Sequence, residues 1–215
     1  MLQINMNLII ELWKFCMGQT QNFGLHLFQF FRVFSTCIAM RKIILQLAVS
    51  LDGFIEGPNG EYDWCFTDQD YGMTAFFQRV DSVFYGRKSY ELVSSMEDAT
   101  NDNAMPGFPK LKEYIFSNTL QTVKPGAHLV SGDIQAAVTQ IKKEPGKDIW
   151  LFGGASLTTS LLNLSLVDEL SLAVHPIILG GGKPLFNHIA NRISLTLIQT
   201  QSYSSGLVSL TYAMK

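Results

Sequence analysis

The segment Trp150–Leu157 reads WLFGGASL, a run of apolar residues that ends in two glycines before a helix-forming stretch. This pattern is typical of a buried strand that turns directly into a helix. The first turn of a helix leaves backbone N–H groups free at a partly positive terminus, where a phosphate can bind. Gly153 and Gly154 would let a ligand approach the main chain, and Ser156 could cap the helix or donate to a phosphate. The same pattern also fits an ordinary tight turn.

A second glycine turn lies earlier in the chain, where residues 85–91 read YGRKSYE. A strand meets Gly86, and Arg87 and Lys88 follow at the start of a helix. Arg offers a planar fork and Lys a point charge to a phosphate, and Ser89 could cap the helix or donate. Alone, the motif also fits a solvated basic pair. Two such turns are what a dinucleotide with a pyrophosphate and a 2′-phosphate requires, so the sequence predicts a nucleotide site.

The order of the predicted elements indicates an α/β fold, because strands and helices alternate early and strands dominate late. The predicted strands are Lys42–Val49, Asp81–Tyr85, Glu113–Phe116, His128–Val130, Ile149–Phe152, Glu169–Ile177, Leu195–Gln199 and Leu207–Met214. The predicted helices are Tyr71–Arg79, Ser89–Val93, Ile134–Lys143 and Ser156–Leu162. We therefore expect three layers, with a mostly parallel central sheet, an antiparallel C-terminal hairpin and ligands at the carboxyl ends of the strands.

The composition suits one globular domain, since 47% of the 215 residues are apolar and 16% are charged. We assign this domain to residues 41–215. Residues 1–40 are rich in Phe, Leu, Asn and Gln and are predicted to be an extension outside the fold, with a second plausible start at Met40. Their apolar runs are too broken to span a bilayer, although an amphipathic helix that touches a membrane or partner is an alternative.

Charge and cysteine content exclude several classes of function. A net charge of −2 gives no general attraction to nucleic acid or to an acidic membrane. The three cysteines are widely spaced and form no zinc, redox or disulfide pattern, which favours a reducing cytoplasm. The four histidines are scattered, so no metal is expected.

Two aspartates are candidates for the chemistry. Asp52 follows the first strand in the sequence SLDGFI, where it could orient a substrate, relay a proton or simply form an Asp-Gly turn. Asp70 precedes a predicted helix and suits an N-cap, with a catalytic role as the alternative. Phe76, Phe77 and Trp64 could form an apolar wall, with core packing favoured for Phe77.

Two further segments are predicted to be irregular. The triple glycine Gly180–Gly182 fits a bend in the chain. Asp98–Pro109 has the composition of a surface loop and could equally close over a site.

Four motifs in this order resemble the dihydrofolate reductase-like family, which includes the C-terminal reductase domain of the bifunctional riboflavin biosynthesis protein. The motifs are Ser50–Ile55, Tyr85–Glu91, Phe152–Leu157 and Val167–Leu170 running into Pro176–Phe186. The resemblance covers about Arg41 to Lys215 and implies a dihydrofolate reductase-like fold, NADPH as cofactor and a homodimer. It places Ala48 and Ile55 near the nicotinamide, Gly86, Arg87, Lys88 and Ser89 near the phosphates, Ser117 near the adenosine end, and Gly153, Gly154, Ala155 and Ser156 under the pyrophosphate.

The chain departs from the riboflavin-pathway reductases at Phe152, where they usually carry an acidic residue, and it resembles stand-alone members of the family. We therefore predict an NADPH-dependent reductase that transfers hydride to a C=N or C=O bond of a small planar or heterocyclic compound. Asp52 is the first candidate for substrate orientation or proton relay, and Asp70 is the second. The alternative is a dimeric nucleotide-binding module that keeps the fold without catalysis.

Overall fold

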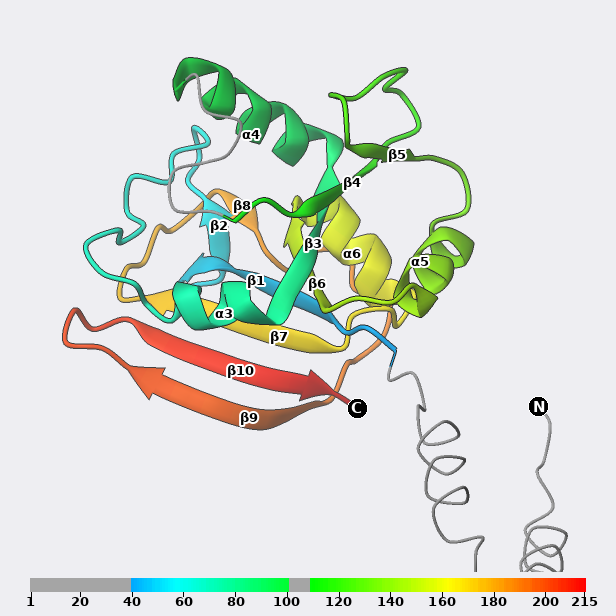
Figure 1. Ribbon diagram of the computed structural model, residues 1–215. Helices are drawn as coiled ribbons and strands as arrows, with labels where there is room; N and C mark the ends of the chain where they lie inside the picture. Colours follow the sequence, from blue (N-terminus) through cyan, green and yellow to red (C-terminus); the bar gives the residue numbers. More distant parts are fainter. Residues whose placement is uncertain (1–39, 101–108) are drawn as a thin grey trace, which may run out of the picture. The chain divides into compact units, whose positions relative to one another are not determined.

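An eight-stranded sheet lies at the centre of the chain and has the order β5-β4-β3-β6-β1-β7-β10-β9 (Figure 1). The computed structural model describes the backbone of residues 40–100 and 109–215 and the side chains of all of these except 97–100. The sheet strands are β1 (Ile43–Ser50), β3 (Val80–Gly86), β4 (Lys112–Phe116), β5 (His128–Val130), β6 (Asp148–Gly153), β7 (Glu169–His175), β9 (Leu195–Ser202) and β10 (Val208–Met214). A separate small sheet pairs β2 (Phe54–Glu56) with β8 (Lys183–Pro184).

The strand directions match the expected fold. The six strands from β5 to β7 in the sheet order are joined by parallel pairings. The last two strands, β9 and β10, form an antiparallel hairpin, and β10 runs antiparallel to β7. The predicted α/β fold, with a mostly parallel sheet and an antiparallel C-terminal hairpin, is therefore confirmed.

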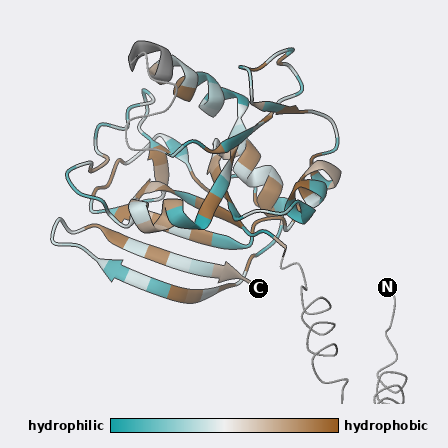
Figure 2. Cartoon of the chain, viewed as in Figure 1, coloured by the Kyte–Doolittle hydropathy of each residue, from teal (hydrophilic) through white to brown (hydrophobic). Residues whose placement is uncertain are grey.

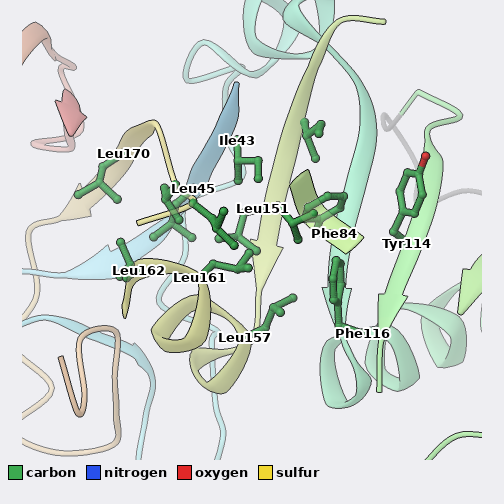
Figure 3. Packing of buried hydrophobic residues seen from close by; sticks show 14 of the residues in the cluster. Ile43, Leu45, Phe84, Tyr114, Phe116, Leu151, Leu157, Leu161, Leu162 and Leu170 are labelled. Carbon is green, nitrogen blue, oxygen red and sulfur yellow. The ribbon is translucent and has the colours of Figure 1, made fainter. Parts of the chain in front are cut away.

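Helices cover both faces of the sheet because the strands bury apolar side chains on both faces. Ile43 and Leu45 of β1 pack in a larger cluster with residues of α5 (Ile134–Lys143) and α6 (Ala155–Asn163). Figure 3 shows Leu157 and Leu161 of α6 packed in this cluster with Leu45 and Leu151. Ile44 instead packs in a smaller cluster with α3 (Met73–Arg79) and α4 (Arg87–Thr100). The alternation along β1 thus produces three layers.

Three helices differ from their predicted bounds, and α6 (Ala155–Asn163) differs from the predicted Ser156–Leu162 by only one residue at each end. Helix α3 begins at Met73 rather than Tyr71, because Tyr71 and Gly72 both have left-handed backbone conformations, with φ of 48° and 82°. Helix α4 begins at Arg87 and runs to Thr100, so Ser89 lies in its first turn and is not the N-cap. The predicted loop Asp98–Pro109 is therefore helical to Thr100, and its part at 101–108 lies outside the described residues, as does the predicted extension at 1–39.

The aromatic residues near α3 divide between two environments. Phe76 is buried, and both Phe76 and Phe77 pack against Trp150, so core packing holds for this pair. Trp64 lies instead in the segment between β2 and α3, edge-on to the ring of His175 at a centroid distance of 5.3 Å.

The connections leave the centre of the sheet in opposite directions. From β1 the chain passes through α3 to β3 on one side, and from β6 it passes through α6 to β7 on the other. The ladder between β1 and β6 also ends at Leu45 and Leu151, before either strand finishes. In open α/β sheets, ligands bind outside the carboxyl ends of the strands at such a switch point.

Candidate functional site

The two glycine turns predicted from the sequence meet at the carboxyl edge of the sheet. Strands β3 and β6 are parallel neighbours, and Tyr85 pairs in register with Gly153. A Cβ atom on Gly154 would lie only 3.2 Å from Oγ of Ser89. The first turns of α4 and α6 therefore lie beside one another, and both direct the positive ends of their dipoles toward the same region.

A cleft of about 370 Å³ opens between these two helix starts. Its volume lies in the range of small-molecule sites in proteins. Eight of the predicted cofactor residues line it, namely Gly86, Arg87, Lys88, Ser89, Ser117, Gly154, Ala155 and Ser156. The other three, Ala48, Ile55 and Gly153, are not among the residues that line the cleft.

The start of α6 is free of side-chain capping. Gly154 is its N-cap residue, with φ of 38° and ψ of 150°, and no side chain there accepts a hydrogen bond from the helix. This backbone conformation is one that only glycine adopts without strain. The N–H groups of the first turn thus remain available to an anion.

Two cations stand at the rim of the cleft. Arg87 forms an exposed ion pair with Glu91 one turn further along α4, with an Nη1 to Oε1 distance of 2.8 Å. Lys88 is exposed and has no ion-pair partner within the described part of the chain. Because an exposed pair such as Arg87–Glu91 is worth little, Arg87 can exchange Glu91 for a phosphate at small cost.

The carboxyl end of β4 closes the other side of the cleft. The Ser117 hydroxyl oxygen accepts hydrogen bonds from the backbone N–H groups of Thr119 and Leu120, which fixes a tight turn. The side-chain oxygen of Asn118 accepts from the N–H of Gly132 at 2.9 Å and so ties this turn to the segment after β5.

Nine further residues line the cleft that sequence reasoning did not assign to the cofactor, namely Phe116, Asn118, Thr119, Val130, Ser131, Ile134, Leu157, Ser160 and Lys183. The position of Asn118 and Thr119 directly after a predicted strand was a signal that could have found them. Lys183 lies in the motif Pro176–Phe186, to which no cofactor role was given. Its Nζ lies 2.9 Å from Oε1 of Glu56, in the ion pair that links β8 to β2.

The residues predicted near the nicotinamide lie deeper in the fold. Ala48 is half-buried in β1 opposite Ala173 of β7, so the sheet carries only small side chains there. Ile55 lies on β2 and packs against the larger cluster. Phe152 contacts the rings of Tyr85 and Trp150 on the face of the sheet that carries the smaller cluster.

Asp52 is exposed, and its carboxylate binds a distant part of the chain. It accepts hydrogen bonds from the Ser50 hydroxyl and from the backbone N–H groups of Leu179 and Gly180, at 2.7, 3.2 and 2.8 Å. The Ser50 hydrogen bond, supported by the two backbone donors, lowers the pKa of Asp52 below its ordinary value. Asp52 is therefore ionised at neutral pH, and it anchors the start of the glycine-rich segment.

Asp70 acts at the start of α3. Its carboxylate accepts from the hydroxyl of Thr74 at 2.6 Å, from the N–H of Thr74 at 3.0 Å and from the N–H of Gly72 at 3.1 Å. These hydrogen bonds, the Thr74 hydroxyl first, lower the pKa of Asp70. The residue satisfies free donors at the helix terminus as a capping residue does, although Gly72 holds the N-cap position.

His175 is a buried polar residue that the sequence did not single out. Its Nε2 accepts a hydrogen bond from the N–H of Phe66 at 3.1 Å, and its Nδ1 lies 3.0 Å from the carbonyl oxygen of Ala173. Burial lowers the pKa of His175. The neutral ring, with its proton on Nδ1, thus fixes the segment between β2 and α3 against the end of β7.

The described residues contain no cluster of three or more His, Cys, Asp or Glu side chains that could hold a metal ion. Across the same residues, every helix is too short or too polar to cross a bilayer.

Comparisons with known proteins give the family. The model of the RibD C-terminal domain matches residues 41–209. The chain is 46% identical over 180 residues to YyaP, an uncharacterized protein of Bacillus subtilis strain 168, which covers 81% of this chain and 96% of that protein. Among solved structures, a putative riboflavin biosynthesis protein from Shewanella sp. PV-4 superposes with a TM-score of 0.70 at 27% identity, covering 81% of this chain and 99% of that one.

A dihydrofolate reductase from Enterococcus faecalis, solved in complex with NADP(H), shares the fold. It superposes with a TM-score of 0.58 at 14% identity, covering 81% of this chain and 96% of that one. The resemblance inferred from the four motifs is confirmed, and the chain belongs to the RibD C-terminal domain family.

Proposed function

We propose that this chain is an NADPH-dependent reductase that transfers hydride to a small planar or heterocyclic substrate. The observation that carries the proposal is the cleft in which the first turns of α4 and α6 meet beneath Arg87 and Lys88. The family and the fold are those of reductases, which supports an oxidoreductase in general.

The residues of the cleft fit the proposed cofactor. Gly154 lines the cleft and carries no side chain, so a pyrophosphate could approach the main chain at the start of α6. Arg87 and Lys88 would hold a further phosphate. NADPH, when bound, supplies the hydride, and the protein orients the two reactants and excludes water.

The hydrogen bonds and pKa values of Asp52 and Asp70 favour a role in positioning over a role in proton transfer. Both carboxylates accept several hydrogen bonds and have lowered pKa values, so neither holds a proton at neutral pH. We propose that Asp52 is a positioning residue that holds Leu179 and Gly180 beside the carboxyl end of β1. The proton that completes the reduction then comes from water or from the substrate.

The same observation favours a second candidate, a nucleotide-binding module without catalysis. Such a module needs the cleft and does not need a proton donor. Oxidation of NADPH, followed by absorbance across dihydrofolate, dihydropterin, quinone and ribosylaminopyrimidine substrates, separates the two. Turnover of any one identifies a reductase, and NADPH binding without turnover of the panel favours the module.

Cofactor binding is tested by calorimetric titration of the full chain and of Arg87→Ala. We expect the dissociation constant for NADPH to rise about tenfold or more in Arg87→Ala, because a charged hydrogen bond to phosphate is lost. Glu91→Ala is the matched control, since it breaks the same ion pair and keeps the cation. Equal NADPH affinity in wild type and Arg87→Ala, or no binding by the folded wild type, would contradict the proposal.

The positioning role of Asp52 is tested with Asp52→Asn. We expect faster hydrogen exchange at the Leu179 and Gly180 amides and lower turnover, with NADPH affinity unchanged, because only one acceptor oxygen remains. Unchanged exchange at both amides removes Asp52 from this role.

A further inference from the structure

Lys183 is a third cation that lines the cleft, besides Arg87 and Lys88. The described residues that line the cleft include no Asp or Glu. Arg87 and Lys88 lie at the start of α4, whereas Lys183 lies on β8. A cleft lined by charges of one sign attracts ligands of the other sign. The proposed function gives a role to the first two cations and leaves Lys183 without one.

The chain around Lys183 is held against α6. Shortly after β8, the carbonyl oxygen of Asn187 accepts a hydrogen bond from the hydroxyl of Thr159 in α6 at 2.9 Å. Helix α6 carries no charged residue, and Figure 2 shows it in white to brown shades over most of its length. Among the described residues that line the cleft, Lys183 is thus the cation on the α6 side, where the pyrophosphate is proposed to bind.

Lys183 donates to Glu56 across the small β2–β8 sheet. Its Nζ lies 2.9 Å from Oε1 of Glu56, and the two residues are partners in the antiparallel ladder. The side chains of Lys183 and Glu56 are 34% and 35% exposed. An ion pair that is exposed to this degree is screened by solvent and contributes little to stability. Lys183 can therefore leave Glu56 with little loss of stability.

Close packing of the main chain keeps the two residues beside one another. A Cβ atom on Gly182 would collide with the carbonyl oxygen of Glu56, so a side chain does not fit there. The N–H of Leu185 donates to the carbonyl oxygen of Gly53 at 2.9 Å. Because the main chain is held on both sides of Lys183, a change of partner requires movement of its side chain alone, and the four-carbon stem is flexible.

We propose that Lys183 binds the pyrophosphate of NADPH and exchanges Glu56 for it, so that Glu56 competes with the cofactor for one ammonium group. This inference rests on the proposed function. The pyrophosphate is the stronger of the two partners, because the N–H groups at the start of α6 favour an anion at the same place. Lys183 thus holds the cofactor, and Glu56 limits its affinity.

The exchange also links the cofactor to β2. In the β2–β8 ladder Ile55 has no partner, because the pairing skips from Phe54 to Glu56. Ile55 packs against the larger cluster, and the family resemblance places it near the nicotinamide. The ion pair that gives way to the pyrophosphate is therefore made by the residue next to Ile55.

The proposal is tested by calorimetric titration of the full chain with NADPH. Lys183→Met removes the cation and keeps the length of the side chain, and it should raise the dissociation constant about tenfold or more. Glu56→Gln breaks the same ion pair and removes the competitor, so it should lower the dissociation constant about two- to fivefold. Lys183→Arg keeps a cation and should restore most of the affinity lost in Lys183→Met.

NADH distinguishes the pyrophosphate from the further phosphate, because NADH carries the first and lacks the second. Lys183→Met should weaken NADH and NADPH binding by the same factor. Arg87→Ala should weaken NADPH binding more than NADH binding.

The ion pair between Lys112 and Glu144 supplies the matched control. Its Nζ to Oε2 distance is also 2.9 Å, its side chains are 42% and 36% exposed, and neither residue lines the cleft. Lys112→Met and Glu144→Gln should therefore bind NADPH as wild type does.

Unchanged NADPH affinity in Lys183→Met, with binding by wild type intact, would overturn this inference and leave the proposed function standing. Shifts of the same direction in Lys183→Met and Glu56→Gln would also overturn it, since loss of a merely structural ion pair acts alike from either side. A loss confined to NADPH would refute the assignment to the pyrophosphate. Absence of NADPH binding by the folded wild type would contradict the proposed function, and this inference with it.

Discussion

The substitution Gly154→Ala tests the cleft where the first turns of α4 and α6 lie beside one another. Gly154 joins β6 to α6 with φ of 38° and ψ of 150°, a conformation that alanine adopts only under strain. The added methyl group would lie 3.2 Å from Oγ of Ser89, which is tighter than ordinary van der Waals contact. The change therefore combines backbone strain with a methyl group placed between the first turns of α4 and α6.

The backbone strain sets the expected loss of stability, and the added methyl group sets the expected loss of NADPH affinity. A residue in a sparsely populated backbone region costs about 1–3 kcal/mol. In a domain of this size, each kcal/mol shifts the melting temperature by roughly 2–4 °C, so the expected loss is about 2–12 °C. The methyl group also occupies the proposed path of the pyrophosphate, and loss of even one charge-assisted hydrogen bond weakens NADPH binding about tenfold or more.

Gly126→Ala is the control that separates the effect of backbone strain from the effect of a methyl group in the cleft. Gly126 has φ of 90°, and a Cβ atom there would meet nothing within 4 Å. Melting by calorimetry should show a comparable loss of stability in both variants, while titration with NADPH should show weaker binding only in Gly154→Ala. If Gly154→Ala bound NADPH with wild-type affinity, the reasoning that places the pyrophosphate beside Gly154 would be refuted.

Two further predictions concern the core and the buried histidine. Leu161 of α6 is fully buried, so Leu161→Ala should lower the free energy of unfolding, measured in urea, by about 2–5 kcal/mol. Leu164→Ala, at the more exposed end of α6, should lower it much less. Equal losses in the two variants would contradict the packing. Burial lowers the pKa of His175 below its ordinary value of 6.5. Below pH 6.5 the unfolded chain therefore binds a proton on this ring, whereas the folded chain does not. The free energy of unfolding should thus fall as the pH drops from about 7.5 to about 5.5. His175→Gln should show a smaller fall over the same range in urea titrations, and an identical fall would contradict the assignment of a neutral ring.

Local pattern was sufficient to predict the fold. Apolar runs of strand length that ended at glycine predicted β3 and β6, and the late succession of strands predicted the hairpin of β9 and β10. The start of α4 was placed two residues late, because Ser89 has the residue type of an N-cap but lies inside the first turn. The residue type of Ser89 favours a cap, but α4 begins directly after β3 ends at Gly86.

The cleft could be predicted in part from the same strand-to-helix motifs. The ends of neighbouring parallel strands meet at one edge, so motifs after β3, β4 and β6 converge. The roles of single side chains were harder to predict from the sequence. Asp52 binds Gly180 across 128 residues of chain, and His175 binds Phe66 across 109. Such contacts depend on how loops return to the sheet, and neither composition nor periodicity records them.

The contact between Asp52 and the glycine-rich segment has a consequence for how the protein responds to acid. Because hydrogen bonds from Ser50, Gly180 and Leu179 lower the pKa of Asp52, this carboxylate keeps its charge at a pH where an unperturbed aspartate is already protonated. Acidification should therefore release the segment at Leu179 and Gly180 only after ordinary surface carboxylates have been neutralised.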